Sequence, residues 1–362
     1  MQNRRKMLKT LKWLLTLLSV VCLAAGGAHA QNNFKLFLVG DAGDDKEPGE
    51  TLIQLRKELL KNPNSAVVFL GDNSYRYILP GVINFGYKGF DSSANTIDKV
   101  SSQLALLDDY HGYAYFVPGN HDWWNRPTYE SGRPKLAMEE SFIEQNLRLN
   151  KTIANPGPVF LPSHGSYGPD VAELNNGRLR LVFIDTYRVI VTGVRKNKIP
   201  PEEELFYLKL DSVIHAGYLL NQKVVVVAHN PVFSIGPNNR VLKNPMFLRR
   251  IKSSMTDFPS YKKMSVRITG ILKKYPGIYY ASGHLHALQY FYTSDSIHYI
   301  ISGAGSKEKM LSEKEKQRYS TDALKHAYIL WNSGGFFALE CSEQQCSTTL
   351  YYDEASAKCI VE

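Results

Sequence analysis

Residues 67–75 read VVFLGDNSY, an apolar run that ends in a glycine and a group of polar side chains. A short apolar run that stops at a glycine is typical of a buried strand. The residues after it, Asp72, Asn73 and Tyr75, offer a carboxylate, an amide and a phenol. We therefore predict a strand whose carboxyl end presents side chains that bind a metal ion.

Four other segments repeat this order of an apolar run, a small residue and ligand-type side chains. They are 34–44 (FKLFLVGDAGD), 113–122 (YAYFVPGNHD), 224–230 (VVVVAHN) and 277–286 (GIYYASGHLH). In open α/β sheets, ligands gather where the strands end on their carboxyl side. Each polar residue alone has a structural alternative as a turn residue, a helix cap or a buried histidine. Taken together, the five segments predict one metal centre.

The periodicity between these segments predicts a mixed α/β fold in one domain. Leu52, Leu55 and Leu59 recur at helical spacing between the first two strands, which indicates a βαβ unit with parallel strands. Helices are expected at 48–61, 96–109, 200–220 and 261–275. Strands are expected at 34–39, 67–70, 113–117, 178–184, 223–228, 277–282, 296–302, 327–331, 336–341 and 348–352.

The connecting segments carry four further predictions. Gly334 and Gly335 indicate a hairpin turn. Residues 76–92 are expected to form a loop beside the site, and the mixed charges of 307–318 indicate a solvated helix. Aromatic residues follow the third segment at Trp123 and Trp124, where they either pack as a wall or contact a substrate.

The first thirty residues have the pattern of a secretory signal peptide. Five basic residues lie between Arg4 and Lys12, residues 14–25 are apolar, and 28–30 (AHA) form an A-x-A cleavage site. The apolar run is short for a membrane span. A lipid anchor on Cys22 is a weaker alternative because bulky Val21 precedes it. We expect an exported protein, periplasmic or secreted, with no transmembrane segment in the mature chain.

The charge balance argues against nucleic acid as a partner. The chain has 43 Lys and Arg against 34 Asp and Glu. Five of the basic residues lie in the leader, so the remainder has 38 basic and 34 acidic residues, a net charge of +4. That charge is mild, and no basic stripe with interleaved aromatic residues is present in the sequence.

The cysteines of the mature chain all lie near its end. They are Cys341, Cys346 and Cys359, which places them in a C-terminal extension, 341–362, that we expect to pack on the domain 31–340. In an exported protein a disulfide is plausible, and Cys341–Cys346 is the closest pair. The odd count leaves one thiol over, and three cysteines without a histidine do not form a zinc site.

The types of ligand suit two metal ions of different charge. Two aspartates and a tyrosinate would carry three negative charges, which favours a hard trivalent ion beside a divalent one. Free tyrosine has a pKa near ~10, so Tyr75 would bind as tyrosinate only beside a strongly acidic ion. This reasoning favours Fe(III) at one of the two positions.

The five segments, in order, resemble the five motifs of the purple acid phosphatases, within the calcineurin-like metallophosphoesterases. The matching stretches are 40–43 (GDAG), 71–75 (GDNSY), 119–122 (GNHD), 226–229 (VVAH) and 283–286 (GHLH). Residues 229–234 (HNPVFS) and 301–305 (ISGAG) resemble the small tartrate-resistant type. The resemblance covers about 34–340. It implies a four-layer fold, a two-sheet β-sandwich flanked by helices, in which the C-terminal strands form much of the second sheet.

The resemblance also implies a role for each matching residue. The ferric ion would be held by Asp41, Tyr75 and His286. The divalent ion (iron, zinc or manganese) would be held by Asn120, His229 and His284, and Asp72 would bridge the two ions. Asn120, His121 and His229 would also bind the substrate, and His121 would help to protonate the leaving alcohol. The nucleophile would be a metal-bound hydroxide.

The implied activity is that of a secreted acid phosphatase that hydrolyses small phosphate monoesters. A phosphodiesterase or nucleotide pyrophosphatase on the same scaffold is the alternative. A non-catalytic surface protein is a third reading, but no ligand is missing from the motifs. Ala42 and Leu285 depart from the family pattern without removing a ligand. Residues 76–92 and 130–155 match nothing in the family pattern, and substrate choice is expected to reside there. The oligomeric state stays open.

Overall fold

The computed structural model describes residues 33–75, 92–123, 129–149, 152–194, 200–236, 259–318, 327–342, 345–352 and 357–361. The predicted signal peptide lies outside these residues, as do Trp124 and all of the loop predicted at 76–92 except Ser92, which begins a helix. Among the described residues, no helix is long and apolar enough to cross a membrane.

The first sheet has six strands in the order β13-β12-β11-β1-β2-β3. The strands β1 (Phe34–Val39), β2 (Ser65–Phe69) and β3 (Tyr113–Phe116) are parallel, and α2 (Glu50–Lys61) connects the first two. This confirms the predicted βαβ unit. The antiparallel strands β11 (Gly335–Cys341), β12 (Cys346–Tyr352) and β13 (Ala357–Val361) extend the sheet on the other side of β1.

The second sheet has seven strands in the order β10-β8-β9-β7-β6-β5-β4. Its parallel centre is formed by β5, β6, β7 and β9, and antiparallel strands border it. The strands are β4 (Asp170–Leu174), β5 (Leu179–Phe183), β6 (Lys223–Val227), β7 (Ile278–Ser282), β8 (Leu288–Tyr292), β9 (Ile297–Ser302) and β10 (Ala327–Leu330).

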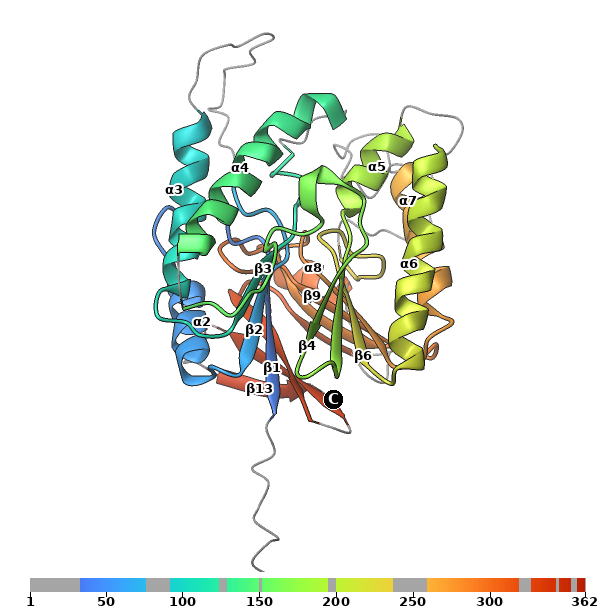
Figure 1. The fold of residues 1–362 in the computed structure, drawn as a ribbon. Coiled ribbons are helices and arrows are strands. Elements are labelled where there is room, and N and C mark those ends of the chain that lie inside the picture. The colour runs from blue at the N-terminus through green and yellow to red at the C-terminus, as the bar shows by residue number, and fades with distance from the viewer. Residues whose placement is uncertain are drawn as a thin grey trace, which may run out of the picture.

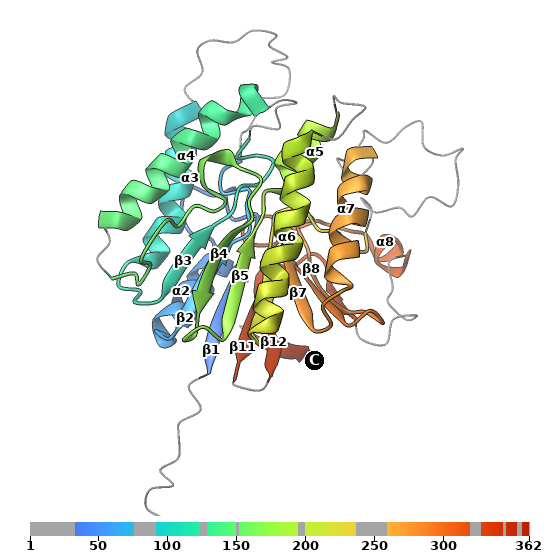
Figure 2. The ribbon, with the colours of Figure 1, turned by 45° about the vertical axis from the view of Figure 1, so that its right-hand side comes forward.

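The helices cover the outer faces of the two sheets, so the molecule has four layers (Figures 1 and 2). The first sheet packs against α2, α3 (Ser92–Leu104), the short 3₁₀ helix η1 (Ala105–Leu107) and α4 (Tyr129–Leu149). The second packs against α5 (Thr186–Val194), α6 (Pro201–Leu219) and α7 (Pro259–Leu272). Two short helices, η2 (Ser163–Gly165) and α8 (Glu313–Arg318), lie in connections. The predicted α/β fold with a two-sheet sandwich flanked by helices is confirmed.

Three apolar cores separate these layers. The central core lies between the sheets, where Leu36 and Leu38 of β1 meet Val225 and Val227 of β6. The outer cores hold the helices, and in each case alternate residues of the parallel strands face opposite cores. Because both faces are covered, the parallel strands are buried along nearly their whole length. The carboxyl ends of these strands are thereby held in fixed relative positions.

Three sequence predictions are corrected by the structure. Gly334 and Gly335 do not form a hairpin turn, because β10 lies in the second sheet and β11 in the first, so the chain crosses between sheets there. Of the predicted C-terminal strands, β9 and β10 join the second sheet as expected, but β11 and β12 join the first. The run 307–318 is helical only from Glu313, and Lys307 lies against a tyrosine of the site described below.

The strands β11 and β12 are joined by a disulfide and by antiparallel backbone hydrogen bonds. Cys341 and Cys346 form a disulfide at the β11–β12 turn, as the sequence suggested.

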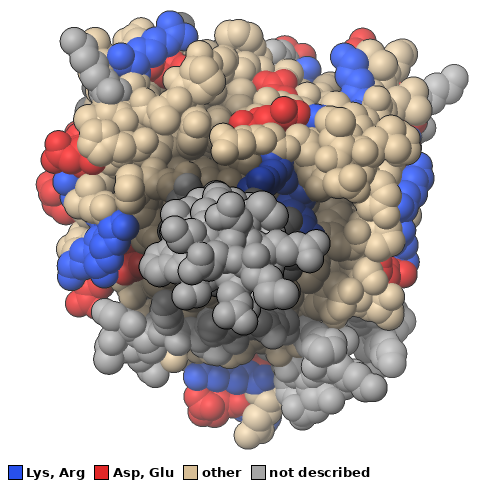
Figure 3. Space-filling model, turned by 60° about the horizontal axis from the view of Figure 1, so that its bottom comes forward, with Lys and Arg blue, Asp and Glu red and all other residues tan. Residues whose placement is uncertain are grey.

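On the face at the bottom of Figure 1, acidic and basic side chains lie interspersed among larger uncharged areas (Figure 3).

Candidate metal centre

The five predicted segments end at one edge of the two packed sheets. Asp41, Asp72 and Asn120 follow β1, β2 and β3, and His229 and His284 follow β6 and β7. Backbone hydrogen bonds tie the loops to each other within the first sheet, where the Asp41 amide donates to the Gly71 carbonyl (2.9 Å), and between the sheets, where the Gly40 amide donates to the Ser302 carbonyl (2.7 Å). The loops from both sheets therefore form one continuous site.

The first group of side chains contains a phenol, a carboxylate and an imidazole. The hydroxyl of Tyr75 donates to Asp41 Oδ1 at 2.6 Å and lies 3.0 Å from His286 Nε2. Asp41 Oδ1 and His286 Nε2 are 3.3 Å apart. The other carboxylate oxygen of Asp41 accepts from the His284 amide at 2.6 Å. Three donor atoms thus converge within hydrogen-bonding distance of one another.

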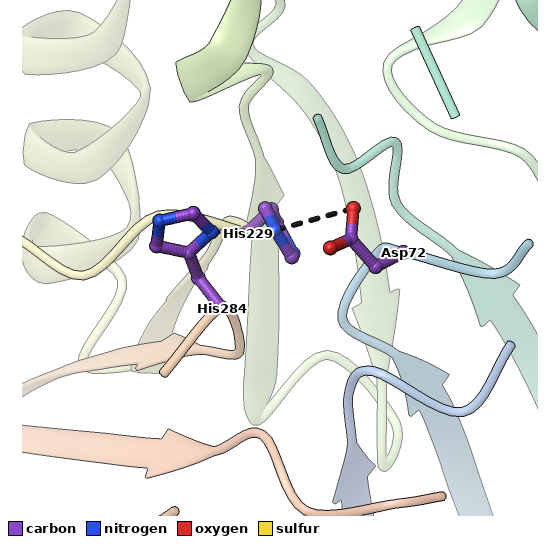
Figure 4. A group of neighbouring side chains, drawn as sticks. All are labelled: Asp72, His229 and His284. Carbon is purple, nitrogen blue, oxygen red and sulfur yellow. Dashed lines mark hydrogen bonds and ion pairs between the residues drawn. The ribbon is translucent and has the colours of Figure 1, made fainter. Parts of the chain in front are cut away.

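The second group centres on His229. Its Nε2 lies 3.0 Å from Asn120 Oδ1, 3.1 Å from His284 Nδ1 and 3.4 Å from Asp72 Oδ1. Figure 4 shows Asp72, His229 and His284 side by side, with the two histidines approaching Asp72 from the second sheet. These three residues place their ligand atoms within 4.8 Å of one another. The structure therefore brings together all seven residues predicted as metal ligands.

The tautomer of His229 follows from its surroundings. Its Nδ1 lies 2.8 Å from the carbonyl oxygen of Leu70, an atom that can only accept a hydrogen bond. The proton on Nδ1 must therefore point at Leu70, which aims Nε2 at the second group. Metal-binding histidines are commonly oriented in this way by a carbonyl partner.

Four of the ligand candidates occupy a strained backbone region. Asp41, Asp72, His284 and His286 have φ angles of 58°, 54°, 74° and 49°. Such left-handed conformations are uncommon outside glycine and cost free energy that the surrounding structure must offset. Each lies in a loop that ends a buried strand, so the strain is concentrated where the loops turn these side chains toward the site.

The pKa values of His229 and His284 are shifted in opposite directions. Burial disfavours protonation of His229, but the carboxylates of Asp72 and Asp41 outweigh it and raise its pKa to about 9. Burial and the charge of His229 lower the pKa of His284 to about 3. Burial, followed by the charges of Asp41 and Asp72, raises the pKa of Tyr75 well above its usual value. The buried carboxylates thus require nearby positive charge, and the donor set of oxygen and imidazole nitrogen fits metal cations.

Comparison with known proteins assigns this arrangement to a family. The sequence model of the calcineurin-like phosphoesterases matches residues 34–288, which include all seven candidate ligands. The chain belongs to this family. A dinuclear metal site is implied by the family, and Asp72, His229 and His284 form a group of the kind that can hold a metal ion.

Individual relatives are more distant. Rabbit (Oryctolagus cuniculus) tartrate-resistant acid phosphatase type 5 is 29% identical over 298 residues, covering 81% of this chain and 77% of the relative. A dimetal phosphatase of Danio rerio has a TM-score of 0.50 at 13% identity, over 91% of this chain and 98% of that one. GAP50, the inner-membrane-complex anchor of Plasmodium, has a TM-score of 0.50 at 15% identity, over 91% and 89%. At these identities the two structures show the fold alone.

His121 of this phosphoesterase lies beside the candidate metal ligands. Its amide donates to Asp72 Oδ1 at 2.8 Å, and its ring centroid is 4.4 Å from that of Tyr75. The residue is only partly buried, unlike His229. Burial lowers the pKa of its imidazole, while Asp72 opposes the shift. The ring therefore lies at the edge of the site, next to a carboxylate but outside the two ligand groups.

Trp123 resolves one alternative left open by the sequence. Its indole is 1% exposed, and Nε1 donates to Asp185 Oδ2 at 2.9 Å. Trp123 belongs to the outer core of the first sheet, where it packs near Tyr187. It is a packing residue rather than a substrate contact.

Four buried residues behind the phosphoesterase site were missed by sequence reasoning. Lys99 and Gln103 of α3 donate to the carbonyls of Tyr75 (2.7 Å) and Asn73 (2.7 Å). Lys135 and Glu139 of α4 contact Ser74 in the same loop. Charged residues at helical spacing usually indicate an exposed face, so the sequence carried no signal that these side chains are buried.

Proposed function

We propose that this phosphoesterase is a dinuclear-metal acid phosphatase of the purple acid phosphatase type, acting on phosphate monoesters. The observation that carries the proposal is the Tyr75–Asp41–His286 group beside the Asp72–His229–His284–Asn120 group. A phenol among metal ligands favours a strongly acidic ion such as Fe(III). The tartrate-resistant acid phosphatase relative, at 29% identity, supports membership of the wider phosphoesterase family.

Within the proposal the two groups hold different ions. Asp41, Tyr75 and His286 would hold Fe(III), and Asn120, His229 and His284 would hold a divalent iron, zinc or manganese ion. Asp72 would bridge them, which agrees with its 3.4 Å separation from His229 Nε2 and its electrostatic effect on Tyr75. When bound, the two ions would supply positive charge to the phosphate and activate the attacking water.

In the proposed reaction, the side chains of the protein would orient the phosphate and supply a proton. His229 and Asn120 line the site, where they would orient the phosphate. The imidazole of His121 would contact the phosphate and hold the proton for the leaving alcohol, because it lies at the partly exposed edge of the site. Burial lowers the pKa of this imidazole. The negative charges of Asp72 and of the dianionic substrate would oppose that shift and favour the protonated form.

The test combines spectroscopy, metal analysis and kinetics on the mature protein (31–362). We expect about two metal ions per chain, a broad visible band from Fe(III)–tyrosinate, and faster hydrolysis of p-nitrophenyl phosphate than of bis-p-nitrophenyl phosphate. A colourless protein with two zinc or manganese ions would overturn the ferric assignment. Faster diester hydrolysis would overturn the monoester assignment in favour of a phosphodiesterase.

We also propose that the protein is exported, on the pattern of residues 1–30. Amino-terminal sequencing of the protein from the extracytoplasmic fraction is expected to begin at Gln31. A mature protein that retains residues 1–30 in the cytoplasm would overturn this proposal.

A further inference from the structure

Helix α4 places a buried ion pair directly behind two loops of the site. Lys135 Nζ lies 3.2 Å from Glu139 Oε2, and their side chains are 2% and 0% exposed. Burying two charges is costly unless each finds further partners. Among the described residues, the hydrogen-bond partners of this pair belong to the loops that follow β2 and β3.

Lys135 binds the loop that carries His121. Its ammonium group donates to the backbone carbonyl of His121 at 3.0 Å and to Ser74 Oγ at 2.5 Å. These two bonds join the third and second motifs to one cation. The His121 carbonyl is therefore fixed from behind, while the imidazole of the same residue lies on the site side against Tyr75.

Glu139 holds the neighbouring loop in place. Its Oε2 accepts from the Ser74 hydroxyl at 2.9 Å, and its Oε1 lies 3.4 Å from Asn73 Nδ2. Asp122 accepts from the Ser74 amide at 3.1 Å and from Asn73 Nδ2 at 3.2 Å, so the second and third motifs are linked twice. Ser74 directly precedes Tyr75, and its position decides where the phenol lies.

The anchoring of α4 to the fold depends on other residues of the helix. Leu136, Ile143 and Leu147 are buried in the outer core of the first sheet. Farther along the helix, Glu144 accepts from the amides of Val159 and Phe160 at 2.8 and 2.9 Å, away from the site loops. The helix would remain attached without its buried ion pair, which leaves the site loops as the elements that the pair serves.

We propose that Lys135 and Glu139 are positioning residues that hold His121 and the Ser74–Tyr75 loop in register with the metal ligands. The role of His121 as proton donor in this inference rests on the proposed function. A displaced proton donor slows esters with poor leaving groups most, because alcohols of high pKa need the proton during bond cleavage. A general loss of folded protein lowers the rate for every ester equally.

The experiment uses three variants and a control from the same helix. Lys135→Met and Glu139→Gln each remove one charge, and Lys135→Met/Glu139→Leu removes both and leaves no unpaired charge in the pair. Glu144→Gln is the control, because it changes a carboxylate of α4 that holds backbone amides outside the site. Each protein is loaded with metal and assayed on aryl and alkyl phosphates of increasing leaving-group pKa, with KM, metal content and thermal midpoint recorded.

We expect Lys135→Met to retain two metal ions and a KM near that of the wild type. Its kcat on alkyl phosphates should fall about 10-fold or more beyond its fall on p-nitrophenyl phosphate, as part of the roughly 10²–10⁴-fold contribution of a positioned acid. The double variant should recover thermal stability but not the leaving-group profile. Equal loss on all esters, or full recovery of the profile in the double variant, would overturn the proposal.

A second readout does not depend on activity. The imidazole Cε1–H signal of His121 is assigned by its absence from the spectrum of His121→Asn, in protein from which metal has been removed by chelation. We expect Lys135→Met to shift or broaden this signal, and Glu144→Gln to leave it in place. An unchanged His121 signal in Lys135→Met would overturn the inference. Failure of the wild type to hydrolyse any phosphate ester would instead count against the proposed function.

Discussion

The hydroxyl of Tyr75 donates a hydrogen bond to Asp41 Oδ1 at 2.6 Å, joining the loops that follow the two parallel strands β1 and β2. Both residues are buried, and the neighbouring carboxylates oppose ionisation of the phenol. Binding of a cation by this pair would therefore require the phenol of Tyr75 to lose its proton. A trivalent ion between these oxygens would make the tyrosinate the favoured form.

The first prediction concerns Tyr75→Phe. In the proposed site, removing the phenol oxygen would remove the ligand that would give Fe(III) its visible band, while Asp41 and His286 remain. We expect loss of the band, weaker retention of iron during dialysis against a chelator, and lower kcat. Absorption spectra and metal analysis of the same sample check this outcome. A variant that keeps the band would mean that Tyr75 is not the source of the colour.

The second prediction concerns Asp72→Asn. Asparagine tolerates the left-handed backbone that Asp72 adopts and has nearly the same size, so the variant should fold. It loses the negative charge shared by both ligand groups. We expect loss of both metal ions and activity near background, measured by metal analysis and turnover. A variant with full metal content would show that Asp72 does not bridge the ions.

The third prediction concerns His121→Asn. His121 lies outside the ligand groups, so the metal content should remain at the wild-type level. Without the imidazole proton, kcat should fall by roughly 10²–10⁴-fold, the usual contribution of a general acid. Steady-state kinetics and metal analysis test this together. Near-normal turnover would remove His121 from the proposed chemistry.

The fourth prediction concerns Gly119, whose lack of a side chain brings two motifs together. A Cβ atom at this position would lie 2.3 Å from both the amide nitrogen and Oδ1 of Asp72. Gly119→Ala should therefore displace Asp72 and weaken metal binding. Gly270→Ala is the control, because a Cβ there meets nothing within 4 Å in helix α7. The control should gain about 0.5–1 kcal/mol of stability, measured by denaturant unfolding.

The fifth prediction concerns the stability of the protein in acid. It rests on His298 of β9, which is not one of the candidate metal ligands. His298 is partly buried, stacks on Tyr279 at 4.2 Å and lies 2.9 Å from the Tyr290 hydroxyl. Burial, helped by the charge of Lys223, lowers its folded-state pKa from 6.5 to about 4.

The sign of the effect follows from that shift. Between about pH 6.5 and 4 the unfolded chain binds a proton at His298 that the folded chain does not, so the free energy of unfolding falls as the pH falls. We expect His298→Gln to flatten this part of the stability profile, measured by urea unfolding across the range. His111→Gln, at an exposed histidine, should change the slope less. Equal slopes for the wild type and His298→Gln would contradict the assignment.

The sequence predicted the parallel strands, and the meeting of the candidate ligands at their ends, because both rest on local patterns, whereas β4, β8 and β13 were not predicted. Each ligand follows an apolar run that a glycine or alanine ends, and parallel strands must bring such ends together. The helix α6 was also predictable, since Pro200, Pro201 and the acidic residues after them are typical of a helix start.

Other features depend on contacts that no local pattern carries. Lys135 and Glu139 have the spacing of an ordinary exposed ion pair, and only the packing of α4 behind the site buries them. Gly334 and Gly335 have the composition of a hairpin turn, but the choice between two sheets is made by the partners of β10 and β11. Lys307 lies in a charged run, yet its ammonium group sits 4.2 Å from the ring centroid of Tyr75.

The position of β1 between β2 and β11 has a consequence for biosynthesis. The first strand of the domain is completed by residues 337–341, more than 290 residues later in the chain. Throughout synthesis, one side of β1 therefore exposes unpaired amides and carbonyls of an apolar strand, a template for mispairing with other chains. A ribosome that stalls, or a gene truncated, before codon 335 would release an aggregation-prone chain even though every metal ligand has been made. Folding quality is thus controlled from the opposite end of the polypeptide to the strand that starts the domain.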